Sequence, residues 1–168
     1  MADVKLAYGT EADVTITLAS LATSSTKLVG RQSTAIDNSS NKHIDYLVSG
    51  KITTGTTPTA AKSIEIWCVA ALDYATPTYL AGFGASDAAG PTLIAENKNS
   101  VLKLVASIAT NVTSNQEYSF GAVSIAALFG GIVPPKFVLF VTHDTGVNLN
   151  STSGNHKIRV QPVYETVA

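Results

Sequence analysis

The stretch that decides the fold is Ser63-Ile64-Glu65-Ile66-Trp67-Cys68-Val69-Ala70-Ala71-Leu72. It is rich in apolar, β-branched and aromatic residues and lacks the spacing of an amphipathic helix, which predicts a central β-strand. A second stretch, Lys136-Phe137-Val138-Leu139-Phe140-Val141-Thr142-His143, is almost continuously apolar. Such a run is typical of a strand that is buried on both faces. Together the two stretches predict a core built from β-sheet.

Outside these stretches, apolar residues mostly recur at every second position. Further strands are expected at residues 14–18, 27–33, 44–53, 101–108, 118–121 and 156–164. Turn-forming residues separate them, and one short helical segment is expected near residues 122–129, before two glycines. Seven or eight strands joined by turns predict an all-β fold, an antiparallel β-sandwich. Within that class we expect a jelly roll, in which two four-stranded sheets are joined by Greek keys.

The chain of 168 residues is expected to form one sandwich domain over residues 11–168, preceded by an N-terminal arm at residues 1–10. Residues 73–99 carry Gly and Pro without a stable period. We expect them to form a long loop, and loops of this size are usually functional or interfacial.

The surface carries little charge. Asp, Glu, Lys and Arg make up 14% of the residues, against about 25% in an average soluble domain. The formal net charge is −1, which argues against electrostatic binding of nucleic acid or of an acidic membrane. No apolar stretch is long enough to span a bilayer, and no signal peptide is visible. A surface of this kind suits a protein that is covered by copies of itself or by a partner.

The sequence predicts no catalytic, cofactor-binding or metal site, and therefore no enzyme. The three histidines, His43, His143 and His156, are far apart and lack metal-ligand spacing, although His143 and His156 could converge at strand ends. Asp144-Thr145-Gly146 occurs once and is interpreted as a β-turn rather than as half of an aspartic-protease site. The lone Cys68 excludes an internal disulfide and is expected to be a buried thiol.

Several stretches in order along the chain carry a resemblance to a known class of protein. They are Gly30-Arg31-Gln32-Ser33-Thr34, Gly50-Lys51-Ile52-Thr53-Thr54-Gly55, Ile64-Glu65-Ile66-Trp67, residues 120–131 and Phe140-Val141-Thr142-His143-Asp144-Thr145-Gly146. With them the chain resembles the small virion structural proteins of tailed bacteriophages, in particular the jelly-roll decoration or cement type. The resemblance implies a non-enzymatic protein that is assembled in the host cytoplasm, binds the outside of the capsid and stabilises it. The implied partners are the major capsid protein and further copies of the chain, as a dimer or trimer.

Two alternatives remain open: a tail or head-fibre structural module, and a carbohydrate-binding β-sandwich. The second requires exposed aromatic side chains, whereas Trp67 lies in the middle of a predicted strand and is expected to be buried.

The contact surface is expected on segments that carry apolar residues without a clear strand period. These segments are the arm, the 73–99 loop and the stretch after the short helix. The candidate interface residues are Val4, Leu6, Tyr8, Tyr74, Tyr79, Leu80, Phe83, Phe129, Ile132 and Val133. The alternative for the loop is that it folds over its own sheet.

Overall fold

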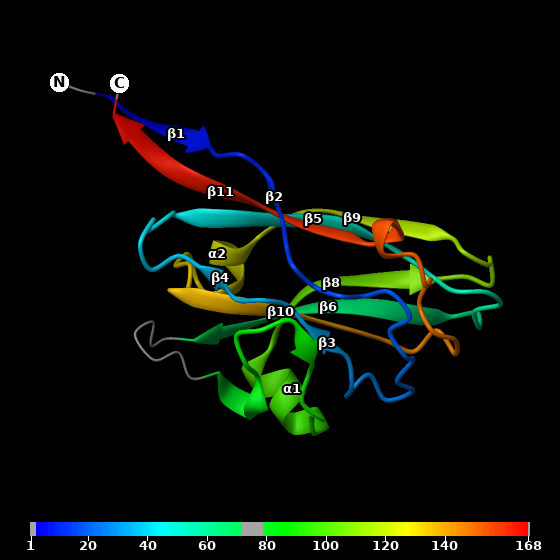
Figure 1. Ribbon diagram of the computed structural model, residues 1–168. Coiled ribbons are helices and arrows are strands. Elements are labelled where there is room, and N and C mark those ends of the chain that lie inside the picture. Colours follow the sequence, from blue (N-terminus) through cyan, green and yellow to red (C-terminus); the bar gives the residue numbers. More distant parts are fainter. Residues whose placement is uncertain (1–2, 72–78, 168) are drawn as a thin grey trace.

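A computed structural model describes residues 3–71 and 79–167 as two antiparallel sheets packed face to face (Figure 1). The fold is an all-β sandwich, as predicted. The first sheet has the strand order β1-β11-β5-β9, and β2 pairs with β11 as well. Its strands are β1 (Val4–Tyr8), β2 (Ala12–Asp13), β5 (Asp45–Thr53), β9 (Glu117–Ser124) and β11 (Lys157–Val167).

The second sheet has the strand order β7-β3-β10-β6-β8, with β4 paired to β10. Its strands are β3 (Arg31–Gln32), β4 (Ile36–Asp37), β6 (Lys62–Ala71), β7 (Ala88–Ala89), β8 (Lys103–Thr110) and β10 (Lys136–His143). The helical elements of the described residues are α1 (Ala95–Val101), α2 (Ile125–Leu128) and the 3₁₀ turns η1 (Leu80–Gly82) and η2 (Ser153–Asn155).

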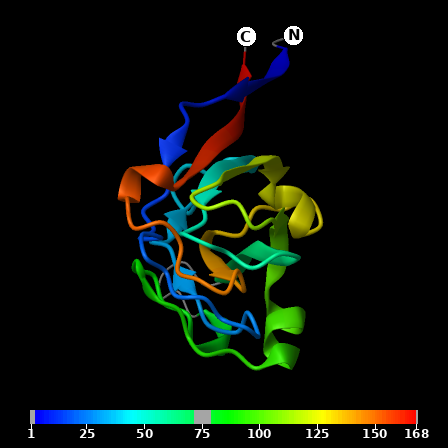
Figure 2. The ribbon, with the colours of Figure 1, turned by 90° about the vertical axis from the view of Figure 1, so that its right-hand side faces the viewer.

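The two stretches that predict the fold lie side by side at the centre of the second sheet. β6 and β10 pair over eight residues, with Trp67 opposite Phe140 and Ile66 opposite Val141. One face of the pair packs against the first sheet, where Ile66 and Leu139 join the main core. The other face is covered by the segment that contains η1 and α1 (Figures 1 and 2), and Phe140 lies in this smaller cluster. Burial on both faces explains why β10 is apolar almost throughout.

The strand predicted at residues 14–18 is wrong, and so is most of the strand predicted at residues 27–33. Here the chain crosses between the edges of the two sheets. Val14 N donates to the Ile158 carbonyl of the first sheet, and Thr34 N donates to the Thr15 carbonyl. Leu18 is still buried in the main core. The alternating pattern therefore reflects burial of one side of an extended connection rather than pairing in a ladder.

The region predicted as a long loop at residues 73–99 is more ordered than expected, because its described part contains η1, β7 and most of α1. The helix predicted near residues 122–129 is shorter than expected. β9 continues to Ser124, whose hydroxyl accepts a hydrogen bond from Ala127 N and caps α2. The chain leaves α2 through Gly130, at a φ of 73° that favours glycine.

Candidate interaction surface

The two ends of the described chain form a ribbon that extends beyond the body of the sandwich (Figures 1 and 2). β1 pairs with the end of β11, from Tyr8 opposite Val163 to Val4 opposite Val167. The pairing of β11 with β5 ends at Val163, so the ribbon has only two strands beyond this point. We call residues 4–8 and 163–167 the terminal ribbon. An isolated two-stranded ribbon is marginally stable in water.

One face of the terminal ribbon exposes four apolar side chains together with Glu165, which lies opposite Leu6. Val4, Leu6 and Tyr8 occupy alternate positions of β1 and therefore share a face, and Val167 lies on the same face opposite Val4. Their exposed fractions are 63%, 61%, 61% and 72%. Single exposed apolar residues are common, but neighbours on one projecting face indicate a contact surface.

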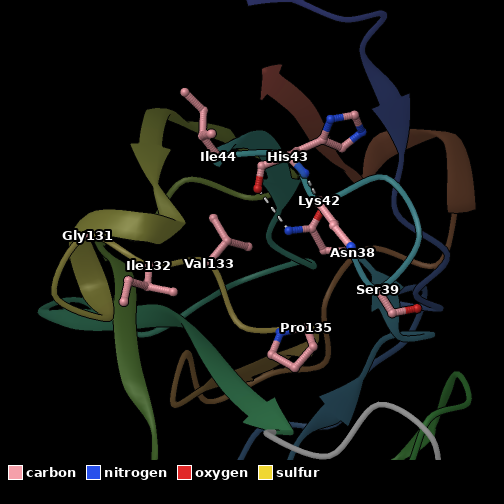
Figure 3. A pocket seen from close by; sticks show the side chains of 9 residues that line it. All are labelled: Asn38, Ser39, Lys42, His43, Ile44, Gly131, Ile132, Val133 and Pro135. Atoms are coloured by element: carbon pink, nitrogen blue, oxygen red, sulfur yellow. Dashed lines mark hydrogen bonds between the residues drawn. The ribbon is translucent and has the colours of Figure 1, made fainter. Parts of the chain in front are cut away.

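A hollow of about 390 Å³ opens at the same end of the sandwich (Figure 3). Its apolar wall contains Ile44, Val133, Pro135 and Ile132, and Ile132 is 75% exposed. Its lining is completed by Asn38, Ser39, Lys42, His43 and Gly131. We call it the end hollow.

Asn38 holds the loop on the polar side of the end hollow. Its side-chain Nδ2 donates to the His43 carbonyl at 2.9 Å, and its Oδ1 accepts from His43 N at 2.8 Å. These two bonds from one side chain to the backbone of His43 fix the loop between β4 and β5. The hollow is therefore bordered by a fixed loop.

The terminal ribbon lies beside the end hollow. A second depression of about 320 Å³ lies between them, lined by Lys42, His43 and Ile44 of the end hollow together with Tyr164 and Glu165 of the ribbon. The rings of His43 and Tyr164 lie 5.7 Å apart between centroids.

The structure brings together only some of the candidate interface residues. Val4, Leu6 and Tyr8 are exposed on the terminal ribbon, and Ile132 and the buried Val133 line the end hollow. Leu80 is exposed on η1, away from this surface, and Phe129 is half-buried against the main core. Tyr74 lies outside the described residues.

Tyr79 and Phe83 are not surface residues. Both are buried in the smaller cluster, and the Phe83 ring meets the Phe140 ring edge-on at a centroid distance of 5.3 Å. For these two residues the alternative is therefore correct: this part of the predicted 73–99 loop folds over its own sheet. Sequence reasoning missed Ile44, Tyr164 and Val167, and Val167 lies beyond the strand expected at residues 156–164.

Unlike His43, the other two histidines, His143 and His156, hold loops at the opposite end of the sandwich. His143 is fully buried, with Nε2 3.0 Å from the Leu21 carbonyl and Nδ1 2.9 Å from the Thr145 hydroxyl. His156 Nε2 lies 2.8 Å from the Asn150 carbonyl. Burial lowers the pKa of both rings. Within residues 3–71 and 79–167, no group of three or more His, Cys, Asp or Glu side chains could hold a metal ion.

Glu65 is the centre of a partly buried charge cluster on the outer face of the second sheet. Its carboxylate lies 2.8 Å from Lys27 Nζ and 2.6 Å from Lys98 Nζ, and it accepts a bond from Trp67 Nε1 at 3.0 Å. Lys98 is only 7% exposed and lies 4.7 Å from the centroid of the half-buried Trp67 ring. Burial acts to raise the pKa of Glu65, but the bonds from Lys27 and Lys98 outweigh it and the pKa is lowered. All its close partners are satisfied within the chain, so the cluster attaches α1 to β6.

None of the helices in the described ranges is long and apolar enough to cross a membrane. No protein-family model matches the chain, and a search of curated proteins found no similar sequence.

Proposed function

We propose that this protein is a non-enzymatic structural component of a phage virion that binds the outside of the capsid and stabilises it. Its partners in this proposal are the major capsid protein and further copies of the chain. The observation that carries the proposal is the terminal ribbon, which exposes four apolar side chains on one projecting face. Contact with another subunit would bury this face and offset the entropic cost of ordering the ribbon.

The low charge of the chain supports the same proposal. Only 14% of the residues are charged, so neighbouring subunits on a lattice repel each other weakly. Many modest contacts repeated over a symmetric shell can act together, because each bound subunit raises the effective concentration for the next contact. A shell-binding protein therefore does not need one large interface.

We also infer that the sandwich is a jelly roll. The support is the order of the strands. Four strands of the first sheet lie in the order β2-β11-β5-β9, and four strands of the second sheet lie in the order β3-β10-β6-β8. Consecutive long strands mostly change sheet, as from β5 to β6, β8 to β9, β9 to β10 and β10 to β11. Two four-stranded sheets connected in this way are the arrangement of a jelly roll.

Binding to shells assembled from the major capsid protein of the same genome tests the proposal. We expect the full chain to sediment with the shells. Replacing Leu6 and Tyr8 together by Ser should weaken binding about tenfold or more, because each buried apolar side chain contributes about 1.5–3 kcal/mol.

The matched control is Val112→Ser, because Val112 is exposed to the same 61% as Leu6 but lies in the loop between β8 and β9. Circular dichroism should show an unchanged sandwich for both variants. Equal binding by the double variant and the parent, or no binding by the parent, would contradict the proposal.

A further inference from the structure

We infer that the terminal ribbon pairs with the ribbon of a second copy, edge to edge along β1, to form a four-stranded sheet across a two-fold axis. This inference rests on the proposed function, in which the ribbon is a contact surface. It adds that the partner of the ribbon is a second copy of the chain. The order of the strands across the pair would be β11-β1-β1-β11.

The first step is that β1 is the outermost strand of its sheet, and no other strand of the described residues pairs with its free edge. β1 ends the path β1-β11-β5-β9. Gly9 N donates to the Pro162 carbonyl at 2.8 Å. In an antiparallel ladder, alternate residues bond to the same partner strand, so Ala7 and Lys5 also direct their backbone groups toward β11. Val4, Leu6 and Tyr8 therefore direct their N–H and C=O groups away from it.

The second step is that this edge is self-complementary. A two-fold axis at Leu6 places Leu6 opposite Leu6 of the second copy, and Val4 opposite Tyr8. By symmetry Tyr8 also lies opposite Val4 of the second copy, which makes three pairs. Each pair joins residues whose backbone groups point away from β11, so each pair can exchange two hydrogen bonds. The same three residues carry the exposed apolar side chains. Aromatic and β-branched side chains such as Tyr8 and Val4 pack favourably across a strand pair.

The third step is that charge permits this register. Lys5 is the one charged residue between Val4 and Tyr8. In this register it lies opposite Ala7 of the second copy rather than opposite another lysine, so no like charges face each other. The edge also contains no proline or bulge over residues 4–8, which are devices that commonly protect exposed edges from pairing.

The other edge of the ribbon is less open. Beyond Val163, the free side of β11 lies beside the loop before β5, because Glu165 and Tyr164 line a depression together with Asn41 and Lys42. The geometry therefore favours β1 as the pairing edge. An interface of five residues per copy is small beside the 1,200–2,000 Å² or so of a stable complex. We expect a dimer that dissociates on dilution.

Cysteine cross-linking tests the register directly. The native Cys68 is fully buried, so an introduced cysteine is the one reactive thiol of the described residues. Leu6→Cys places two Cα atoms about 5.5 Å apart across the axis, within the range of about 4.4–6.8 Å that a disulfide spans. Under oxidation the full chain carrying Leu6→Cys should form covalent dimers about tenfold faster or more than the equally exposed Val112→Cys.

A second variant tests the edge without a cross-link. Leu6→Pro removes an N–H that points away from β11, and an edge strand tolerates proline there. Sedimentation velocity over a range of concentrations should show dimer for the parent and monomer for Leu6→Pro, with unchanged circular dichroism. Equal cross-linking of Leu6→Cys and Val112→Cys would overturn the inference.

The two proposals can fail separately. If the parent stays monomeric and the Leu6→Pro variant no longer binds shells, self-pairing is overturned and the capsid protein remains as the partner of the ribbon. A dimer that does not bind shells would support self-pairing and contradict the proposed function.

Discussion

At the scale of single residues, the buried His143 and the half-buried His156 show how this chain uses groups that could carry chemistry. His156 Nδ1 accepts a hydrogen bond from Thr53 N at 3.4 Å, and Nε2 donates to the Asn150 carbonyl. The acceptor role of Nδ1 requires the neutral ring. His143 is likewise close to the Leu21 carbonyl and the Thr145 hydroxyl. The rings hold the loops that connect the sheets. Protonation of either ring should therefore lower the free energy of unfolding.

The free energy of unfolding should fall as the pH decreases from about 7.5 to 5. Burial lowers the pKa of His143 and His156 from the usual 6.5. The unfolded state therefore binds more protons than the folded state below about pH 6.5, and this contribution to stability is lost as the pH falls through the lowered pKa values. Urea denaturation at a series of pH values measures it.

The control for this prediction is His156→Gln, whose amide can accept from Thr53 N and donate to the Asn150 carbonyl without titrating. The variant should show a shallower pH dependence than the parent. A free energy of unfolding that is constant or rises between pH 7.5 and 5 would show that the histidines are not destabilised in their charged form.

At the scale of elements, the long strands could be predicted from the sequence because the pattern and the environment agree. β10 occupies residues 136–143 as expected, since a strand buried on both faces needs apolar side chains at almost every position. α1 was missed because its segment Ala95–Val101 exposes most of its residues and lacks an apolar stripe. Its attachment includes a buried lysine, Lys98, whose partner Glu65 is distant in sequence, and Val101, which packs against the smaller cluster.

The candidate surface could be predicted only in part, because it too depends on contacts between residues that are distant in sequence. The exposed apolar side chains of Val4, Leu6 and Tyr8 can be noticed in the sequence. Their pairing with the last residues of β11 is a contact between the two ends of the chain, which no local pattern records. Conversely, Tyr79 and Phe83 looked like surface residues of a loop, because the face of Phe140 that they cover could not be assigned without the fold.

Glu65→Gln should lower the free energy of unfolding by about 3–5 kcal/mol, because it leaves the ammonium group of the buried Lys98 without a carboxylate. Chemical denaturation followed by Trp67 fluorescence measures the change. The matched control is Glu117→Gln, since the ion pair of Glu117 with Lys51 is solvent-exposed and should contribute less than about 1 kcal/mol.

A further variant separates charge burial from packing. Adding Lys98→Met to Glu65→Gln should restore most of the lost stability, because an apolar side chain does not need a charged partner. Equal effects of Glu65→Gln and Glu117→Gln would show that the cluster does not attach α1 to β6.

At the scale of the whole molecule, the two ends of the sandwich differ in chemistry. One end carries the terminal ribbon and the end hollow, with exposed Leu6, Val167 and Ile132. The other end has loops held by polar contacts, such as Asn150 Nδ2 donating to Asn115 Oδ1 at 2.9 Å. Exposed apolar side chains also occur elsewhere, as at Val112 in the polar loops and at Leu80 and Ile94, but on the terminal ribbon three of them occupy alternate positions of one strand. This row of apolar side chains is the central argument for the proposed shell-bound role.

Electron cryomicroscopy of capsid shells incubated with the full chain tests that argument most directly. We predict added density on the outside of the shell, in which the terminal ribbon and the end hollow contact neighbouring subunits and the loop containing Val112 faces solvent. Shells without added density, or a bound molecule whose terminal ribbon projects uncovered into solvent while the Asn115 and Asn150 loops contact the shell, would contradict the account.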